Sequence, residues 1–362
     1  MPAPVTATPR AFGPPETALL LTLASIWGLS FLFIELALRG LGPMWVVVGR
    51  TGVGAAVLLT VLFLRGHRLP RTRRLWWNVL VLGVMTNAVP WSAVAWAQQS
   101  LPSGLVALLM AAVPTATLLV SVTVGLERFT PARLAGLGLA LAGVAMTVAS
   151  DAAGDRARLV AVGVVLLATV LYGSGAVYAN RRVSGNASAL TIATGQVLTA
   201  FLVTVPVALV LDPLPTAAGL TPDVLGAVAA LGALGTGAAF LVFYTLIERV
   251  GATNTTLVTY LIPLVAVVAG ALLLDERLGV AAIAGGGCIV AGVWLAQRGT
   301  RASGDPTTVE PAHIGPVAAS AEPTPDSDAM DVGSGEGEGT AAGTRPHGPT
   351  APTGSGDPEH AQ

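Results

Sequence analysis

Two stretches of this sequence, PTATLLVSVTVGLERF (residues 114–129) and PLVAVVAGALLLDERL (residues 263–278), share one pattern. Each begins with proline, continues through apolar residues and ends shortly after a Glu–Arg pair. The second stretch lies 149 residues after the first. Two further pairs of positions keep this offset: Gly136 with Gly285, and Gly143 with Gly292. The chain therefore contains an internal duplication.

The composition indicates a protein that lies in a membrane. Of the 362 residues, 53% are hydrophobic and 11% are charged, and the mean hydropathy is +0.72. A soluble domain carries about 25% charged residues. Long apolar runs of roughly 20 residues are typical of transmembrane helices. We expect an all-α polytopic protein with ten spans at 17–38, 43–64, 75–97, 103–125, 131–149, 159–181, 187–211, 224–247, 252–274 and 279–297.

The arginines predict how these spans are oriented. Ten spans place both termini on one side, and the loops of that side carry 13 arginines against four on the other. By the positive-inside rule, both termini are expected in the cytoplasm and the protein in the cytoplasmic membrane. Each copy, 17–149 and 159–297, holds five spans, so the second copy enters from the opposite side. Inverted repeats of this kind are typical of secondary transporters.

The two ends of the chain differ from the apolar part. Residues 1–16 are expected to form a short cytoplasmic segment. Residues 302–362 hold ten acidic residues and one arginine and have no aromatic residue, which predicts a disordered cytoplasmic tail. The tail is either a passive solvating extension or a regulatory element. One cysteine and four histidines, none of the histidines in an apolar run, predict no metal site, and we expect no cofactor.

The duplicated part resembles the EamA domain of the drug/metabolite transporter superfamily. The resemblance is carried by AVAWAQQSLPSGLVALLMAAVPTATLLVSVTVGLERFTPARLAGLGLALAGVAM (93–146) and by FLVFYTLIERVGATNTTLVTYLIPLVAVVAGALLLDERLGVAAIAGGGCIVAGVW (240–294). WGLSF at 27–31 and Arg50 also look like that family. The resemblance covers about 17–297 and implies a ten-helix carrier. Several members of the family export amino acids and other metabolites.

Glu35 and Arg50 are the full charges that lie well inside the expected spans. An ionisable residue within a membrane indicates a functional site by default. The short turn between the two residues makes them neighbours near the external side. Three roles fit this position. The two residues pair and gate the external mouth of the pathway, or Glu35 takes up a proton that is coupled to transport. In the third, the two form an interfacial salt bridge with side chains that reach toward water.

Polar and aromatic residues deeper in the spans predict a substrate pathway. Buried amides and hydroxyls need partners, and an amphipathic ligand needs both ring faces and hydrogen-bond groups. The alternative is that these residues only hold helices together. Pro114 and Pro263 are expected inside the fourth and ninth spans, as hinges or as tolerated kinks. The candidate pathway residues are Trp27, Ser30, Glu35, Arg50, Asn87, Trp91, Trp96, Gln98, Tyr172, Asn180, Gln196, Tyr244 and Tyr260.

The sequence thus predicts a secondary transporter with no catalytic residues. It would move a small metabolite, amino acid-like or amphipathic and drug-like, outward by alternating access of the two copies. Its partners would be the solute and the lipid bilayer, with a proton as a candidate coupling ion, a homodimer as a candidate assembly and no nucleic acid. The alternatives are a flippase for lipid or polyprenyl-linked substrates and a non-transporting receptor. We expect the Glu–Arg pairs to be structural and to fix where helices end.

Overall fold

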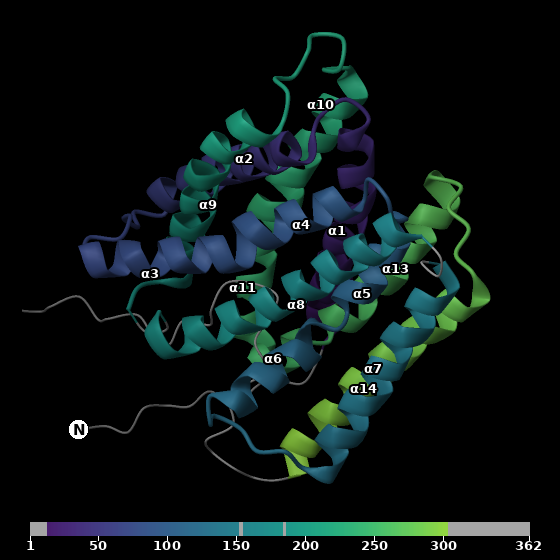
Figure 1. The fold of residues 1–362 in the computed structure, drawn as a ribbon. Coiled ribbons are helices and arrows are strands. Elements are labelled where there is room, and N and C mark those ends of the chain that lie inside the picture. Colours follow the sequence, from purple (N-terminus) through teal and green to yellow (C-terminus); the bar gives the residue numbers. More distant parts are fainter. Residues whose placement is uncertain (1–12, 152–154, 184–185, 303–362) are drawn as a thin grey trace, which may run out of the picture. The chain divides into compact units, whose positions relative to one another are not determined.

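The computed structural model describes residues 13–151, 155–183 and 186–302, and every regular element in these ranges is a helix (Figure 1). The predicted N-terminal segment up to residue 12 and the predicted tail from residue 303 lie outside the described residues. Nine of the described helices are long and apolar enough to cross a membrane, and a tenth, Val258–Leu273, is apolar but shorter. The expected all-α architecture with about ten spans is confirmed.

The described helices fall into the ten expected spans, several of them divided. The first copy consists of α1 Pro14–Leu38, α2 Pro43–Leu64, α3 Arg73–Gly83, η1 Val84–Ala88, α4 Val89–Ala97, α5 Ser103–Met110, α6 Val113–Thr123 and α7 Pro131–Asp151. The second copy consists of α8 Arg156–Arg182, α9 Ala189–Leu211, α10 Pro222–Ala229, η2 Ala230–Ala238, α11 Ala239–Val250, α12 Ala252–Thr255, α13 Val258–Leu273 and α14 Val280–Ala302.

Two equivalent spans contain π-helical segments that the sequence pattern does not reveal. The third span continues from α3 through η1 into α4, and the eighth continues from α10 through η2 into α11. A π-helical turn holds one residue more than an α-helical turn, so it shifts the side chains that follow around the helix axis. Such segments occur mostly at functional sites. Here η1 contributes Thr86 and Asn87 to the cavity described below, and η2 contributes Thr236, which contacts a residue of its lining, Arg50.

The two repeat-related prolines behave differently. Pro114 lies in the first turn of α6, directly after the turn at Ala111 and Ala112 that separates α5 from α6. A first-turn proline is tolerated, because its missing N–H would have no partner within the helix. Pro114 therefore lies inside the fourth span, Ser103–Thr123, as expected, at the point where the span divides into α5 and α6. Pro263 does lie inside α13, as expected, and the ninth span is interrupted earlier, at Thr256 and Leu257.

The last helices of the two copies, α7 and α14, lie side by side along one edge in Figure 1. They are in contact through the repeat-related glycines. A Cβ added to Gly136 would lie 2.5 Å from the carbonyl oxygen of Gly292, and one added to Gly143 would lie 2.4 Å from that of Gly285. Only glycine permits this approach of two backbones. The first glycine of one helix meets the second of the other, so equivalent helices run antiparallel, as an inverted repeat requires.

A second repeat-related contact joins the opening helix of each copy to the other copy. A Cβ at Gly28 in α1 would lie 2.6 Å from the Cβ of Val265 in α13. A Cβ at Gly173 in α8 would lie 2.7 Å from the backbone nitrogen of Thr117 in α6. The glycines that directly follow Trp27 and Tyr172 thus bring α1 and α8 against the opposite copy. This packing turns Trp27 and Tyr172 toward the middle of the molecule.

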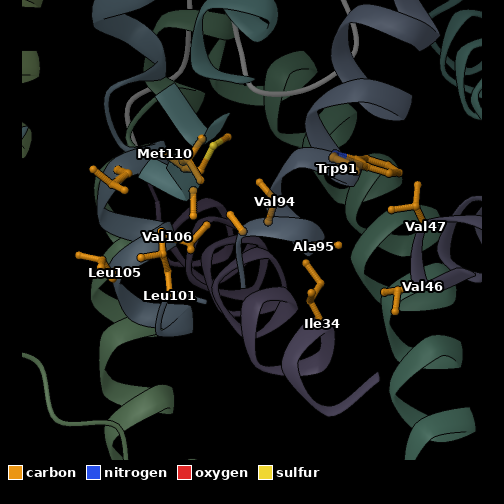
Figure 2. Packing of buried hydrophobic residues seen from close by; sticks show 14 of the residues in the cluster. Ile34, Val46, Val47, Trp91, Val94, Ala95, Leu101, Leu105, Val106 and Met110 are labelled. Carbon is orange, nitrogen blue, oxygen red and sulfur yellow. The ribbon is translucent and has the colours of Figure 1, made fainter. Parts of the chain in front are cut away.

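Buried apolar side chains of the described residues form two large clusters. Figure 2 shows one of them, in which Trp91, Val94 and Ala95 of α4 lie between Ile34 of α1 and residues of α2 and α5. The other gathers residues of α1, α2, α9, α11 and α13 around Phe243. The clusters fix the helices that carry the polar residues of the candidate site.

Candidate functional site

A cavity lies between the two copies. Most of its lining is apolar. Pockets for small organic ligands are typically lined in this way, by apolar side chains with a few polar groups among them. Both copies supply polar and aromatic lining residues: Trp27, Ser30, Arg50, Thr86, Asn87 and Trp91 from the first, and Tyr172, Gln196 and Thr259 from the second.

Arg50 of α2 is the charged residue of this lining. Its side chain is 8% exposed, and its Cζ atom lies 3.8 Å from the centroid of the Trp91 ring, a cation–π contact. Its Nε donates a hydrogen bond of 3.2 Å to the hydroxyl of Thr236. Trp91 in turn donates its Nε1–H to the hydroxyl of Tyr172. Arg50, Trp91 and Tyr172 therefore form one connected group that spans both copies.

The π-helical segment η2 places Thr236 where it can receive Arg50. The Thr236 hydroxyl donates to the carbonyl of Leu231, five residues earlier, at 3.2 Å, which leaves its oxygen free to accept from Arg50. Glycine brings α2 close enough: a Cβ at Gly54 would lie 2.7 Å from Cγ2 of Thr236. The arginine is therefore held by a neutral hydroxyl and a ring face.

Amide groups line other parts of the cavity. Asn87 in η1 is 2% exposed, and its Oδ1 lies 2.9 Å from the hydroxyl of Thr86. Gln196 of α9 is also 2% exposed, and its Oε1 has no hydrogen-bond partner within the described part of the chain. A buried acceptor without a partner is costly, so such a group is a natural contact for a ligand that brings a donor.

The cavity brings together seven of the predicted pathway residues and leaves six outside its lining. Trp96 and Asn180 are exposed, and Gln98 donates its Nε2 to the carbonyl of Phe31 at 2.9 Å. Tyr244 packs edge-on against Phe243, and Tyr260 donates to Gln297 at 2.7 Å. These contacts match the alternative of helix packing. The residues at the cavity are Trp27, Ser30, Arg50, Asn87, Trp91, Tyr172 and Gln196, and those outside its lining are Glu35, Trp96, Gln98, Asn180, Tyr244 and Tyr260.

The predicted pair of Glu35 and Arg50 does not form. Arg50 is engaged by Trp91 and Thr236, as described above. The charged groups that act on the Glu35 carboxylate are instead Glu276 and Arg39. Its Oε2 is buried without a hydrogen-bond partner in the described residues. Sequence proximity misled here, because the short turn between α1 and α2 joins their ends but does not fix which way each helix faces.

The sequence reasoning missed three polar residues of the site: Thr86 and Thr259, which line the cavity, and Thr236, which binds Arg50. All three are threonines in apolar spans, a residue type that usually bonds to its own helix backbone and gives no signal of its own. The signal that could have found Thr236 is its run of small residues, GALGTGA at 232–238. Such a run of small residues allows η2 to approach α2 closely. The π-helical conformation of η2, in contrast, gives no signal in the sequence.

Comparisons with known proteins identify the family of this chain. The model of a family described as EamA-like transporter family matches residues 16–149 and 159–297. The uncharacterized inner membrane transporter YedA of Escherichia coli is 28% identical over 266 residues, 72% of this chain and 83% of that protein. A probable terminal-alkyne amino-acid exporter of Streptantibioticus cattleyicolor is 28% identical over 289 residues, 78% of this chain and 93% of that protein.

Two more similarities each cover three quarters or more of the chain. An uncharacterized transporter of Archaeoglobus fulgidus is 24% identical over 280 residues, 76% of this chain and 95% of that protein. A solved crystal structure aligns with a TM-score of 0.58 at 19% identity and covers 80% of this chain and 99% of its own. At this identity the likeness concerns the fold alone.

Proposed function

Because the chain belongs to the EamA-like transporter family, we propose that it is a secondary transporter that moves a small, amino acid-like organic metabolite out of the cell. The observation that carries this proposal is the cavity between the two copies, lined by residues of both. A site between inverted repeats is where alternating access exposes a solute to one side and then the other. The relative named as an amino-acid exporter supports the outward direction and the solute class.

The orientation of the chain forms part of the proposal. The excess of arginines in the loops on the side of the termini favours a cytoplasmic location for both ends. The end of the bundle that carries Ser103 and Glu276 is then external. There α5 and α13 are in contact, since a Cβ at Gly104 would lie 3.3 Å from the Cα of Val267. Outward release requires this contact to open.

Counterflow in proteoliposomes tests the proposal. Purified protein is reconstituted into vesicles, which are loaded with one unlabelled solute, and entry of the same solute in labelled form is followed. The assay is repeated for each member of a panel of amino acids, organic acids, nucleosides and cationic drugs. We expect counterflow for one or more of the solutes. No counterflow for any solute would refute the transport function.

Two tryptophans of the same span provide a matched pair of variants for this assay. Trp91 lines the cavity, whereas Trp96, five residues later, is 40% exposed. We expect Trp91→Ala to reduce counterflow about ten-fold or more, because it removes a ring face of the site. Trp96→Ala should leave counterflow near that of the unchanged protein. Equal loss in both variants would indicate a general effect on folding.

A further inference from the structure

We infer that Arg50 is the anion-binding residue of the cavity and that the solute places a carboxylate on its guanidinium. The inference rests on the proposed function, in which this cavity is the transport site. It adds a specificity-determining residue and a charge class. Solutes that carry a carboxylate are accepted, and solutes whose only charge is positive are rejected.

The first observation is that the charge of Arg50 is buried without a counter-ion. No carboxylate lies within ion-pair distance of Arg50 in the part of the chain that the structure describes. A buried arginine is costly unless it is paired, and the hydroxyl of Thr236 and the face of Trp91 neutralise none of its charge. A charge kept at this cost within a span indicates that a ligand supplies the missing anion.

The second observation is the way in which the guanidinium is held. Its Nε donates a hydrogen bond to Thr236, and its Cζ lies 3.8 Å from the centroid of the Trp91 ring. Among the described residues no hydrogen bond reaches either Nη atom, and the side chain lines the cavity. A guanidinium fixed at Nε and presenting its Nη groups matches the two oxygens of a carboxylate.

The third observation is the charge of the whole lining. Among the described residues, the cavity lining includes no aspartate, glutamate, lysine or histidine, so Arg50 gives this lining one positive charge. One positive charge balances a monoanion. A phosphate with nearly two negative charges would need a further cation. A cationic solute would meet a like charge in a poorly solvated space, which is strongly unfavourable.

The rest of the cavity fits the remainder of such a solute. Trp27, Trp91 and Tyr172 offer ring faces for an apolar body. The unpartnered Oε1 of Gln196 accepts from a donor, such as the amino group of a zwitterion. Gln196 is uncharged, so it adds selectivity for a donor without requiring a positive charge. A carboxylate is therefore essential, and an amino group is secondary.

A matched set of probes tests the inference by binding, without any need for transport. Thermal-shift titrations of the purified full-length protein use L-leucine, L-leucinamide and 4-methylpentanoate, which share one apolar body. Leucinamide lacks the carboxylate, and 4-methylpentanoate lacks the amino group. We expect leucine and 4-methylpentanoate to raise the melting temperature and leucinamide to have no effect. Equal stabilisation by leucinamide, or none by either carboxylate, would overturn the inference.

Three variants locate the effect at named residues. Arg50→Gln should weaken carboxylate binding by about 30-fold or more, the effect of removing one partner of a buried charge pair. Gln196→Leu should reduce only the preference for leucine over 4-methylpentanoate. Arg277→Gln, an exposed arginine of the α13–α14 turn, removes the same charge from the chain and should leave all titrations unchanged.

The melting temperature without ligand separates a binding role from a structural one. Because Arg50 is buried without a counter-ion, Arg50→Gln should leave the unliganded protein as stable as before or more stable. A lower melting temperature without ligand would assign Arg50 to the packing and overturn the inference. The two proposals fail separately: no counterflow with intact carboxylate binding refutes transport, and counterflow that ignores the carboxylate refutes the role of Arg50.

Discussion

Glu127 and Glu276 end the same turn in the two copies, but their carboxylates bind different groups. In each copy the backbone N–H of the glutamate donates to a carbonyl six residues earlier, that of Ser121 at 3.3 Å and that of Gly270 at 3.1 Å. Glu276 then accepts hydrogen bonds from the backbone N–H groups of Ser103 at 2.7 Å and Gly104 at 3.1 Å, across the copies.

Glu127 instead binds within its own copy. Its Oε2 lies 2.8 Å from Nη2 of Arg133, and the two side chains are 6% and 3% exposed. The position 149 residues after Arg133 is Ala282, so Glu276 has no equivalent arginine. One arginine thus explains why a repeated glutamate is part of a local ion pair at one end and of a contact between copies at the other.

The Glu276 contact also explains how α5 begins. Its N-cap, Pro102, offers no side-chain cap, and the first N–H groups of a helix have no partner within the helix. The Glu276 carboxylate satisfies two of them and lies at the positive end of the helix dipole. The expected structural role of the Glu–Arg pairs is therefore supported for both glutamates. The adjacent arginines, Arg128 and Arg277, are exposed.

Breaking the Glu127–Arg133 pair should have the largest effect. Arg133→Met leaves a buried carboxylate without its cation, and we expect a loss of about 3–5 kcal/mol in unfolding free energy. The double variant Glu127→Leu/Arg133→Met should recover most of it, because it buries no charge. Arg128→Met is the matched control and should change little. A larger drop in melting temperature for Arg128→Met than for Arg133→Met would contradict the role of the buried pair.

Removing the Glu276 cap should rank second. Glu276→Ala leaves two N–H groups of α5 without an acceptor, and we expect a loss of about 2–3 kcal/mol. Glu276→Lys, which places a cation at the positive end of the helix, should reduce the yield of folded protein further. Arg277→Ala should stay within about 0.5 kcal/mol of the unchanged protein. A normal yield of Glu276→Lys with altered solute selectivity would contradict a structural role.

Adding a side chain at Gly270, which lies in close contact with Glu276, should have the third-largest effect on stability. A Cβ at Gly270 would lie 2.4 Å from Oε2 of Glu276 and 3.2 Å from Oγ of Ser103, whereas its counterpart in the first copy is Ser121. We expect Gly270→Ala to cost about 1–2 kcal/mol by overpacking. Gly287 in α14 has nothing within 4 Å of such a Cβ, so Gly287→Ala should be neutral or stabilising. Equal changes in unfolding free energy for Gly270→Ala and Gly287→Ala would refute the close contact at Gly270.

The smallest expected effect is a pH dependence at Glu127. Burial raises the pKa of this carboxyl above its ordinary value of 4.5, and Arg133 lowers it only in part. The folded protein then binds more protons than the unfolded chain between the two pKa values. Stability therefore falls as pH rises through this window and is constant above it. Subtracting the melting curve of Glu127→Gln from that of the unchanged protein should show this slope, and a rise with pH would refute it.

Several features of the fold follow from the sequence. The ten apolar runs set the spans to within a few residues, because crossing a bilayer requires about 20 residues regardless of context. The 149-residue offset predicted two equivalent halves, and Gly136 and Gly143 pack as repeated positions should. Seven of the thirteen candidate pathway residues line the cavity. Trp91 and Trp96 looked equivalent in the sequence, yet one lines the cavity and the other is exposed.

What the sequence by itself determined is which segments lie in the membrane and which are copies of each other, because hydrophobicity and repetition are properties of the chain. What only the tertiary structure decided is which way each helix faces. Each residue turns the side chain by about 100°, and the π-helical turns η1 and η2 shift that phase. Packing between helices sets this rotation, and it placed Arg50 against Trp91 and Thr236 and not against Glu35.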